Sequence, residues 1–142
     1  GHAKHHFCIY DSVSNGVFTG DTVGIRYQQL IDDGLEFFLP TTSPNQFDPS
    51  AMHAVIERLQ KMNLDYIYFG HFGMTENTQE ALSQVNSWLK LFVEEGKKAD
   101  IQGEDSDALA RTLYKLVRSH LRGKNIQDNH PVYQILQLNM KL

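Results

Sequence analysis

The stretch that most constrains the fold is residues 17–22, which read VFTGDT. Val17 and Phe18 are residue types that favour an extended backbone. Gly20 lets the chain bend or approach another segment closely, and Asp21 then stands where a strand gives way to a loop. Taken alone, a Gly-Asp pair after a strand is more often a turn than a functional site. With suitable partners, the same pair delivers one carboxylate to the rim of a sheet.

A hairpin is predicted around this stretch. Residues 7–10 (FCIY) predict a strand, residues 11–16 a polar turn, and residues 17–19 the returning strand. His2 precedes the first strand and Asp21 follows the second. The two side chains are therefore expected at the same end of the sheet.

A helix and a second strand follow further along the chain. Asp48 and Pro49 suit the start of a helix, where unpaired amides accept a side-chain cap and proline is tolerated. Apolar residues then recur at helical spacing as far as Met62. Residues 66–69 (YIYF) predict a strand buried on both faces. His71 lies on its exit loop, where open α/β sheets place their ligands.

The segment between the hairpin and this helix is less regular. Residues 22–30 allow either a strand or a loose helical turn. Residues 35–40 predict an extended segment that stops at Pro40. Residues 41–46 predict a loop, which we interpret as part of a pocket wall.

From residue 75 onward the pattern is helical only. Apolar residues at helical spacing predict three helices, the first of which ends near Gly96. The chain is therefore predicted to consist of an α/β part, residues 1–74, and a helical carboxyl-terminal extension, residues 75–142.

Composition excludes several classes of partner and site. The 142 residues carry a formal net charge of −4, which gives no electrostatic footprint for nucleic acid. No apolar run reaches the roughly 18 residues of a membrane span, so a cytoplasmic location is the default expectation. The single cysteine excludes an internal disulfide and a metal cage built from thiolates.

Three motifs together resemble the metallo-β-lactamase superfamily. Residues 1–6 (GHAKHH) are similar to its Gly-His-x-x-x-His segment, and residues 18–22 (FTGDT) to its Phe-(Thr/Ser)-Gly-Asp segment. Residues 70–73 (GHFG) look like its final Gly-His turn. The motifs occur in the family's order, and the resemblance covers roughly residues 1–74. The resemblance implies an α/β fold that is the carboxyl-terminal half of an αββα sandwich.

The resemblance also implies a site for two divalent metal ions. His2 would bind the first metal, His71 the second, and Asp21 would bridge both and orient the nucleophile as the catalytic residue. His6 would support the ligands rather than bind metal. Neutral imidazoles and a carboxylate suit zinc, iron or manganese, and zinc is the expected metal. Two metals about 3.5 to 4 Å apart can hold a hydroxide that attacks a carbonyl or phosphoryl centre.

One part of the family pattern is absent from this sequence. The His-x-His-x-Asp-His loop, which supplies most of the metal ligands in the family, does not occur. We therefore interpret the chain as half of a larger site and expect negligible activity from the isolated chain. Half of the sandwich would leave one sheet face uncovered, so the chain is expected to pair with a second copy as a homodimer, to retain the missing amino-terminal half, or to be only marginally stable.

The function implied by the resemblance is metal-dependent hydrolysis of an ester, thioester or amide in a small-molecule substrate. Two alternatives stay open. The same ligands would serve iron in an oxidoreductase, since family members with iron sites carry out redox chemistry. The chain could also be a non-catalytic structural or oligomerising module, because three ligands alone cannot hold two metals. Any single histidine, taken alone, is more often a satisfied polar residue than a ligand.

Overall fold

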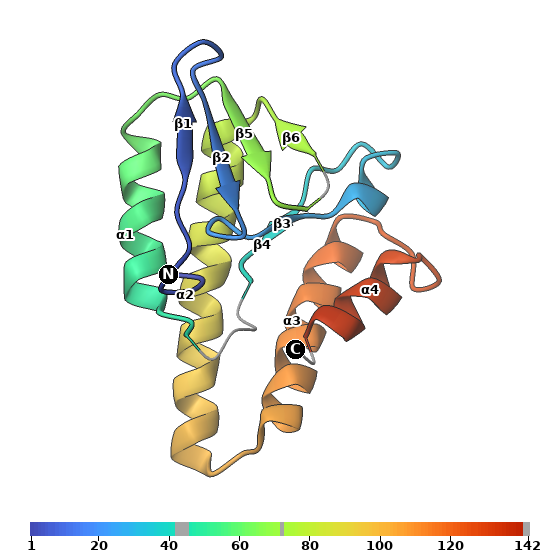
Figure 1. Ribbon diagram of the computed structural model, residues 1–142. Coiled ribbons are helices and arrows are strands. Elements are labelled where there is room, and N and C mark those ends of the chain that lie inside the picture. Colours follow the sequence, from blue (N-terminus) through green and yellow to red (C-terminus); the bar gives the residue numbers. More distant parts are fainter. Residues whose placement is uncertain (42–45, 72, 141–142) are drawn as a thin grey trace. The chain divides into compact units, whose positions relative to one another are not determined.

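A computed structural model describes residues 1–41, 46–71 and 73–140 of the chain (Figure 1). The described residues form a mixed α/β arrangement with two small sheets. The elements of the α/β part are β1 (Ile9–Asp11), β2 (Gly16–Gly20), β3 (Ile25–Arg26), a 3-10 turn (Gln28–Leu30), β4 (Phe38–Leu39), α1 (Pro49–Gln60), β5 (Tyr66–Phe69) and β6 (Met74–Thr75). The helices that follow are α2 (Thr78–Gln102), α3 (Ser106–Gly123) and α4 (Val132–Asn139).

The larger sheet has the strand order β1-β2-β5-β6. The predicted hairpin is confirmed: β1 and β2 pair antiparallel, with Ile9 opposite Phe18. Strand β1 begins two residues later than the sequence predicts, because Phe7 is 72% exposed and precedes the pairing. Strands β2 and β5 run parallel, with Val17 opposite Ile67. Parallel strands end at the same edge of a sheet, so the loops after β2 and β5 lie next to each other.

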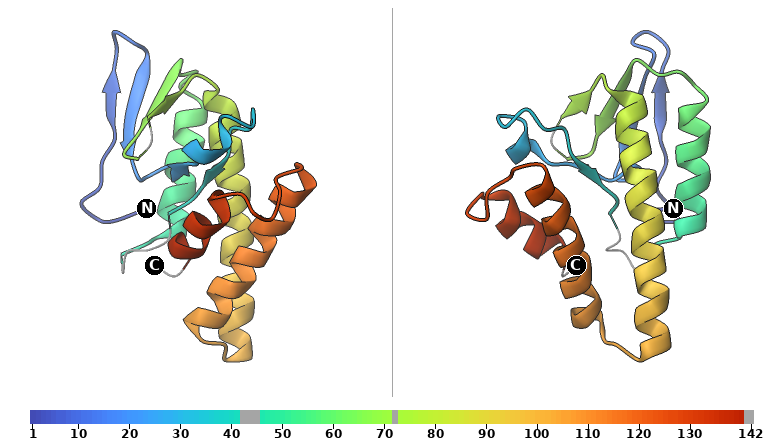
Figure 2. Two further views of the ribbon diagram at one scale, coloured as in Figure 1. Left: turned by 90° about the vertical axis from the view of Figure 1, so that its right-hand side faces the viewer. Right: turned by 180° about the vertical axis from the view of Figure 1, so that it is seen from behind.

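The inner face of this sheet is covered by α1 and by the first turns of α2, as Figure 2 shows from behind. Helix α1 begins where the sequence predicts, because the Asp48 carboxylate accepts a hydrogen bond from the Ala51 amide at 3.0 Å. Its buried side chains recur at helical spacing and pack toward the sheet. They are Met52, Ile56 and Leu59. The core of the α/β part therefore lies between this sheet face and the two helices.

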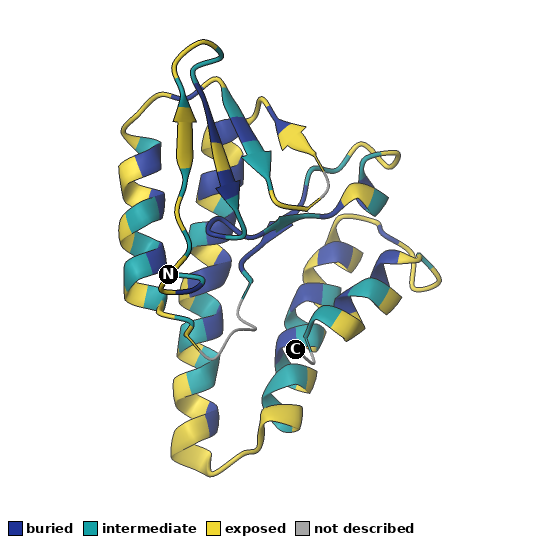
Figure 3. Cartoon of the chain, in the orientation of Figure 1, coloured by how far each residue is buried: buried dark blue, intermediate teal, exposed yellow. Residues whose placement is uncertain are grey.

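The outer face of the same sheet carries three aromatic side chains. Phe18 stacks on Tyr68 with ring centroids 4.4 Å apart, and Tyr66 stacks on Tyr68 at 6.0 Å. Phe18 is 48% exposed, and strand β1 is largely yellow in Figure 3. The prediction that β5 is buried on both faces is therefore wrong. Only Ile67 is buried, because the two tyrosines stand on the outer face with Phe18.

The undecided segment after the hairpin contains both kinds of structure. Residues 25–26 form β3, which pairs with β4, and residues 28–30 form a 3-10 turn. The extended segment predicted for residues 35–40 contains β4, whose two residues are buried. Of the loop predicted for residues 41–46, positions 42–45 lie outside the described residues.

The described chain separates into two compact units, residues 1–90 and 91–142. The sequence predicts a boundary at residue 74 instead. The first turns of α2 remain with the sheets because their side chains hold the smaller sheet and the strands. Gln84 accepts a hydrogen bond from the Phe38 amide at 3.1 Å, and Trp88 packs edge-on against Phe37.

In the second unit, α3 packs on α4 through buried leucine and valine side chains. Helix α3 begins after Asp105, whose carboxylate accepts from the Ala108 amide at 2.8 Å. The prediction that the preceding helix ends near Gly96 is wrong, since α2 continues to Gln102. A glycine inside a helix costs only about 1 kcal/mol, and the helix stops at Gly103, which has φ +69°. Within the described residues, no helix combines the length and apolarity required to cross a membrane.

Candidate metal centre

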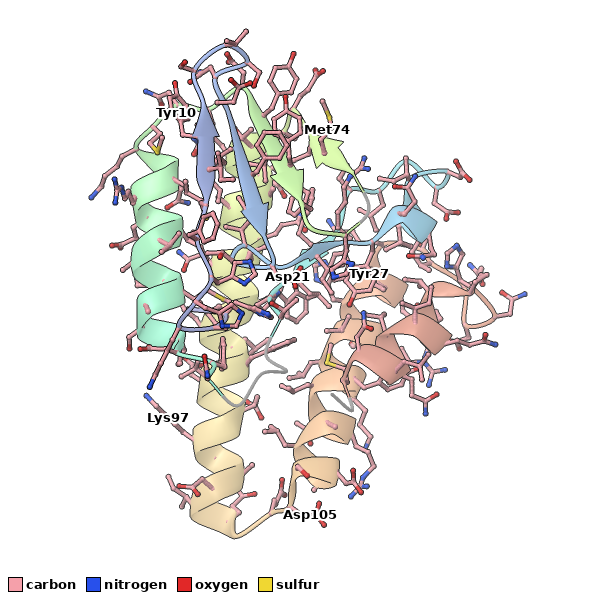
Figure 4. All side chains as sticks on the ribbon, in the orientation of Figure 1. Tyr10, Asp21, Tyr27, Met74, Lys97 and Asp105 are labelled. Atoms are coloured by element: carbon pink, nitrogen blue, oxygen red, sulfur yellow. The ribbon has the colours of Figure 1, made fainter. Side chains whose placement is uncertain are left out.

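Three side chains named from the sequence meet at the carboxyl edge of the larger sheet. Asp21 follows β2, His71 follows β5, and His2 lies in the segment before β1. The Nε2 atom of His2 is 3.7 Å from Asp21 Oδ2, and the Nε2 atom of His71 is 3.5 Å from Asp21 Oδ1. Figure 4 labels Asp21 at the end of β2. Each oxygen of one carboxylate therefore faces a different imidazole.

Two glycines let the two loops approach each other. Gly20 adopts φ +51°, a conformation that favours glycine, and turns the chain at the end of β2. The Gly70 amide donates to the Gly20 carbonyl at 3.0 Å. A side-chain carbon on Gly70 would lie only 3.0 Å from Asp21 Oδ1. The absence of a side chain at Gly70 thus gives the carboxylate its position beside His71. Phe72, which follows His71 in the third motif, lies outside the described residues.

His6 supports the backbone of Asp21. The Asp21 amide donates to His6 Nε2 at 3.2 Å. The His6 ring also meets the His2 ring edge-on, with centroids 4.9 Å apart. A side-chain carbon on Gly20 would fall 2.2 Å from His6 Nε2, so the imidazole fills the space that this glycine leaves open. This contact agrees with a supporting role for His6.

Thr41 was not singled out by sequence reasoning, yet it contacts both His2 and Asp21. Its hydroxyl donates to the Asp21 carbonyl oxygen at 2.9 Å and lies 2.8 Å from His2 Nδ1. A carbonyl oxygen can only accept, so the hydroxyl proton points to Asp21 and His2 Nδ1 must donate to the hydroxyl. The hydrogen-bond network thereby assigns the proton of neutral His2 to Nδ1. The lone pair of Nε2 then faces the carboxylate.

In this arrangement the lone pair of His2 Nε2 faces a carboxylate oxygen of Asp21, so two electron-rich atoms face each other. Burial lowers the pKa of His2, and this effect outweighs the opposing attraction of the Asp21 carboxylate. His2 is therefore predominantly neutral at pH 7. Asp21 Oδ1 is buried, and no hydrogen-bond donor from the described residues reaches it. Burying such an oxygen without a partner is costly, and a cation beside it would remove that cost.

The donors fit a metal ion chemically but do not enclose one. Imidazole nitrogen and carboxylate oxygen are suitable ligands for zinc, iron and manganese. Within residues 1–41, 46–71 and 73–140, no group of three or more histidine, cysteine, aspartate or glutamate side chains is arranged to hold a metal ion. Asp21 instead takes part in two separate pairs, one with His2 and one with His71. Each pair would be half of a coordination shell.

Comparison with known proteins gives no further assignment. No protein-family model matches the chain, and no curated protein matches it either. The resemblance to the metallo-β-lactamase superfamily therefore depends on the three motifs and on the residues named above.

Proposed function

We propose that this chain supplies one set of ligands to a two-metal site of metallo-β-lactamase type, whose activity is metal-dependent hydrolysis. The observation that supports this proposal most strongly is the Asp21 carboxylate, whose two oxygens face two different imidazoles. A carboxylate that lies between two imidazoles can contact two cations, each of which is also bound by one of the rings. The buried Oδ1 adds support, because it accepts no hydrogen bond from the described residues and is an atom that a cation would satisfy.

His2 and Asp21 would hold one divalent cation, and His71 and Asp21 would hold the other. Zinc is the expected metal, with iron or manganese as alternatives. Bound metals would supply Lewis acidity for attack on the carbonyl of an ester, thioester or amide in a small-molecule substrate. The residues of this chain contribute geometry: Asp21 orients toward both positions, His2 offers a neutral nitrogen, and His6 holds the backbone of Asp21.

The remaining ligands would come from outside these residues. The aromatic outer face of the larger sheet supports this view, since Phe18 is 48% exposed there and stacks with the half-buried Tyr66 and Tyr68 on the sheet that carries the site. Exposed apolar surfaces of this kind mark interaction sites. The proposed fold, half of an αββα sandwich, would pair there with an amino-terminal half or with a second copy of this chain.

The test is metal stoichiometry. Purified chain is dialysed against Zn²⁺, and the metal retained per chain is measured by elemental mass spectrometry. We expect retention by the wild-type chain and its loss in Asp21→Asn, because an amide has neither the charge nor two equivalent oxygens. Asp100→Asn is the matched control, since Asp100 is an exposed aspartate near the end of α2. Equal retention by wild type and Asp21→Asn, or none by either, would overturn the proposal.

The metal present as isolated separates the alternatives. Zinc agrees with a hydrolase, whereas iron with a coloured protein would favour the oxidoreductase. Near two metals per chain would mean that a partner supplies ligands. A folded chain that retains no metal would favour a structural or oligomerising module.

A further inference from the structure

We propose that Thr41 is a positioning residue that fixes the ring of His2 so that Nε2 is presented to a metal ion. This inference rests on the proposed function and names a residue that the three motifs do not contain. Thr41 immediately follows Pro40, 39 positions away from His2 in the sequence. Its hydroxyl lies between His2 Nδ1 and the Asp21 carbonyl oxygen, at 2.8 and 2.9 Å.

The direction of these two hydrogen bonds decides what His2 can do. A neutral imidazole carries one proton, on either nitrogen. With the proton on Nε2, His2 would donate toward Asp21 Oδ2, and neither Nε2 nor Oδ2 would be available to a metal ion. With the proton on Nδ1, the lone pair of Nε2 remains available for a metal. The Thr41 hydroxyl accepts from Nδ1 and therefore selects the second arrangement.

Thr41 also links the two ligands. The same hydroxyl donates to the main chain of Asp21, while His6 accepts from the Asp21 amide at 3.2 Å. Both peptide groups that flank the Asp21 side chain are thus held by side chains from distant segments. Ligand rings fixed by a hydrogen bond from the nitrogen that does not bind metal are a common requirement of metal sites. One hydroxyl meets this requirement for His2 and restrains Asp21 as well.

The first test reads the tautomer of His2 in the metal-free chain. Nitrogen NMR at pH 8.5 distinguishes a protonated ring nitrogen from one with a lone pair, and a His2→Gln variant identifies the signals of His2. We expect the wild type and Thr41→Ser to carry the proton on Nδ1. Thr41→Val, which keeps the shape but has no hydroxyl, should shift the population toward the Nε2-protonated tautomer. An unchanged tautomer in Thr41→Val would overturn the proposal.

The second test reads metal affinity. Zinc affinity should fall about 10- to 100-fold in Thr41→Val, the range typical for losing such a supporting hydrogen bond, and Thr41→Ser should restore it to near the wild-type value. The fluorescence of Trp88 checks that each variant is folded. If the wild type binds zinc and Thr41→Val binds it with equal affinity, the role of Thr41 is overturned and the proposed function is not. No zinc binding by the wild type would overturn the proposed function and, with it, the metal-presenting role.

Discussion

Gly20 should be the least replaceable residue of the candidate site, for two separable reasons. Its φ of +51° lies in the left-handed region, which disfavours residues with a side chain. A side-chain carbon at this position would also fall 2.2 Å from His6 Nε2, a distance that forces the imidazole to move. Because that imidazole accepts from the Asp21 amide, Gly20→Ala should disturb the backbone that carries the carboxylate.

Gly34 serves as a control that separates the conformational cost of a side chain from the cost of displacing His6. It has φ +73°, and a side-chain carbon there would meet nothing within 4 Å of the described atoms. Gly34→Ala should therefore show the conformational cost alone, roughly 1 to 2 kcal/mol. Gly20→Ala adds the loss of the hydrogen bond to His6, about 0.5 to 1.5 kcal/mol. The total for Gly20→Ala should be about 1.5 to 3.5 kcal/mol.

Urea unfolding followed by Trp88 fluorescence measures both variants, because Trp88 lies in the same compact unit as the two glycines. We expect the free energy of unfolding to fall by about 1 kcal/mol more in Gly20→Ala than in Gly34→Ala, which is the hydrogen-bond contribution. Zinc retention should fall in Gly20→Ala only. Equal losses of stability, together with unchanged zinc retention, would show that His6 does not support Asp21 in the way described.

Two further predictions concern Glu36 and Gly70. Burial alone would raise the pKa of Glu36, but hydrogen bonds from Asn77, Thr75 and Arg26 outweigh it and leave the pKa below its usual 4.5. A lowered folded-state pKa stabilises the protein above about pH 4.5, and this stabilisation is lost as the pH falls through the folded-state value. Glu36→Gln should therefore lose less stability on acidification than the wild type does. Urea unfolding at several pH values between 3 and 7 measures this difference in the free energy of unfolding. Gly70→Ala should weaken zinc affinity in equilibrium dialysis, because the added carbon would sit 3.0 Å from Asp21 Oδ1, and unchanged affinity would argue against that oxygen as a ligand.

The parts of the fold that sequence reasoning obtained are those with local causes. The hairpin follows from two short apolar runs around a polar turn, and α1 begins where Asp48 caps Pro49. The parallel pairing of β2 with β5 was not predicted, because β3, the 3-10 turn, β4 and α1 lie between these two strands in the sequence. That pairing places Asp21 and His71 at one edge, whereas the sequence alone had placed only His2 and Asp21 at the same end of the sheet.

The failures have non-local causes. The sequence of β5 is apolar throughout, but whether its tyrosines are buried depends on whether another layer covers them, and the described residues leave them half exposed. Gly96 looks like a helix end, yet α2 continues past it for six residues to Gln102. The two-residue strand β6 carries too short a pattern to be recognised.

In the candidate site, too, some residues could be predicted from the sequence and one could not. His2, Asp21 and His71 could be named because metal sites constrain residue type and motif spacing. Thr41 could not, because a threonine in a loop has no distinguishing neighbourhood in the sequence. Thr41 matters because its hydroxyl proton points to the Asp21 carbonyl oxygen, which can only accept. The hydroxyl oxygen is therefore left to accept the proton of His2 Nδ1. A chain with valine at position 41 would keep all three motifs and be predicted to bind metal equally well, whereas the hydrogen-bond network predicts that it would bind more weakly. The comparison of Thr41→Val with Thr41→Ser therefore tests whether the geometry adds information that the motifs do not carry.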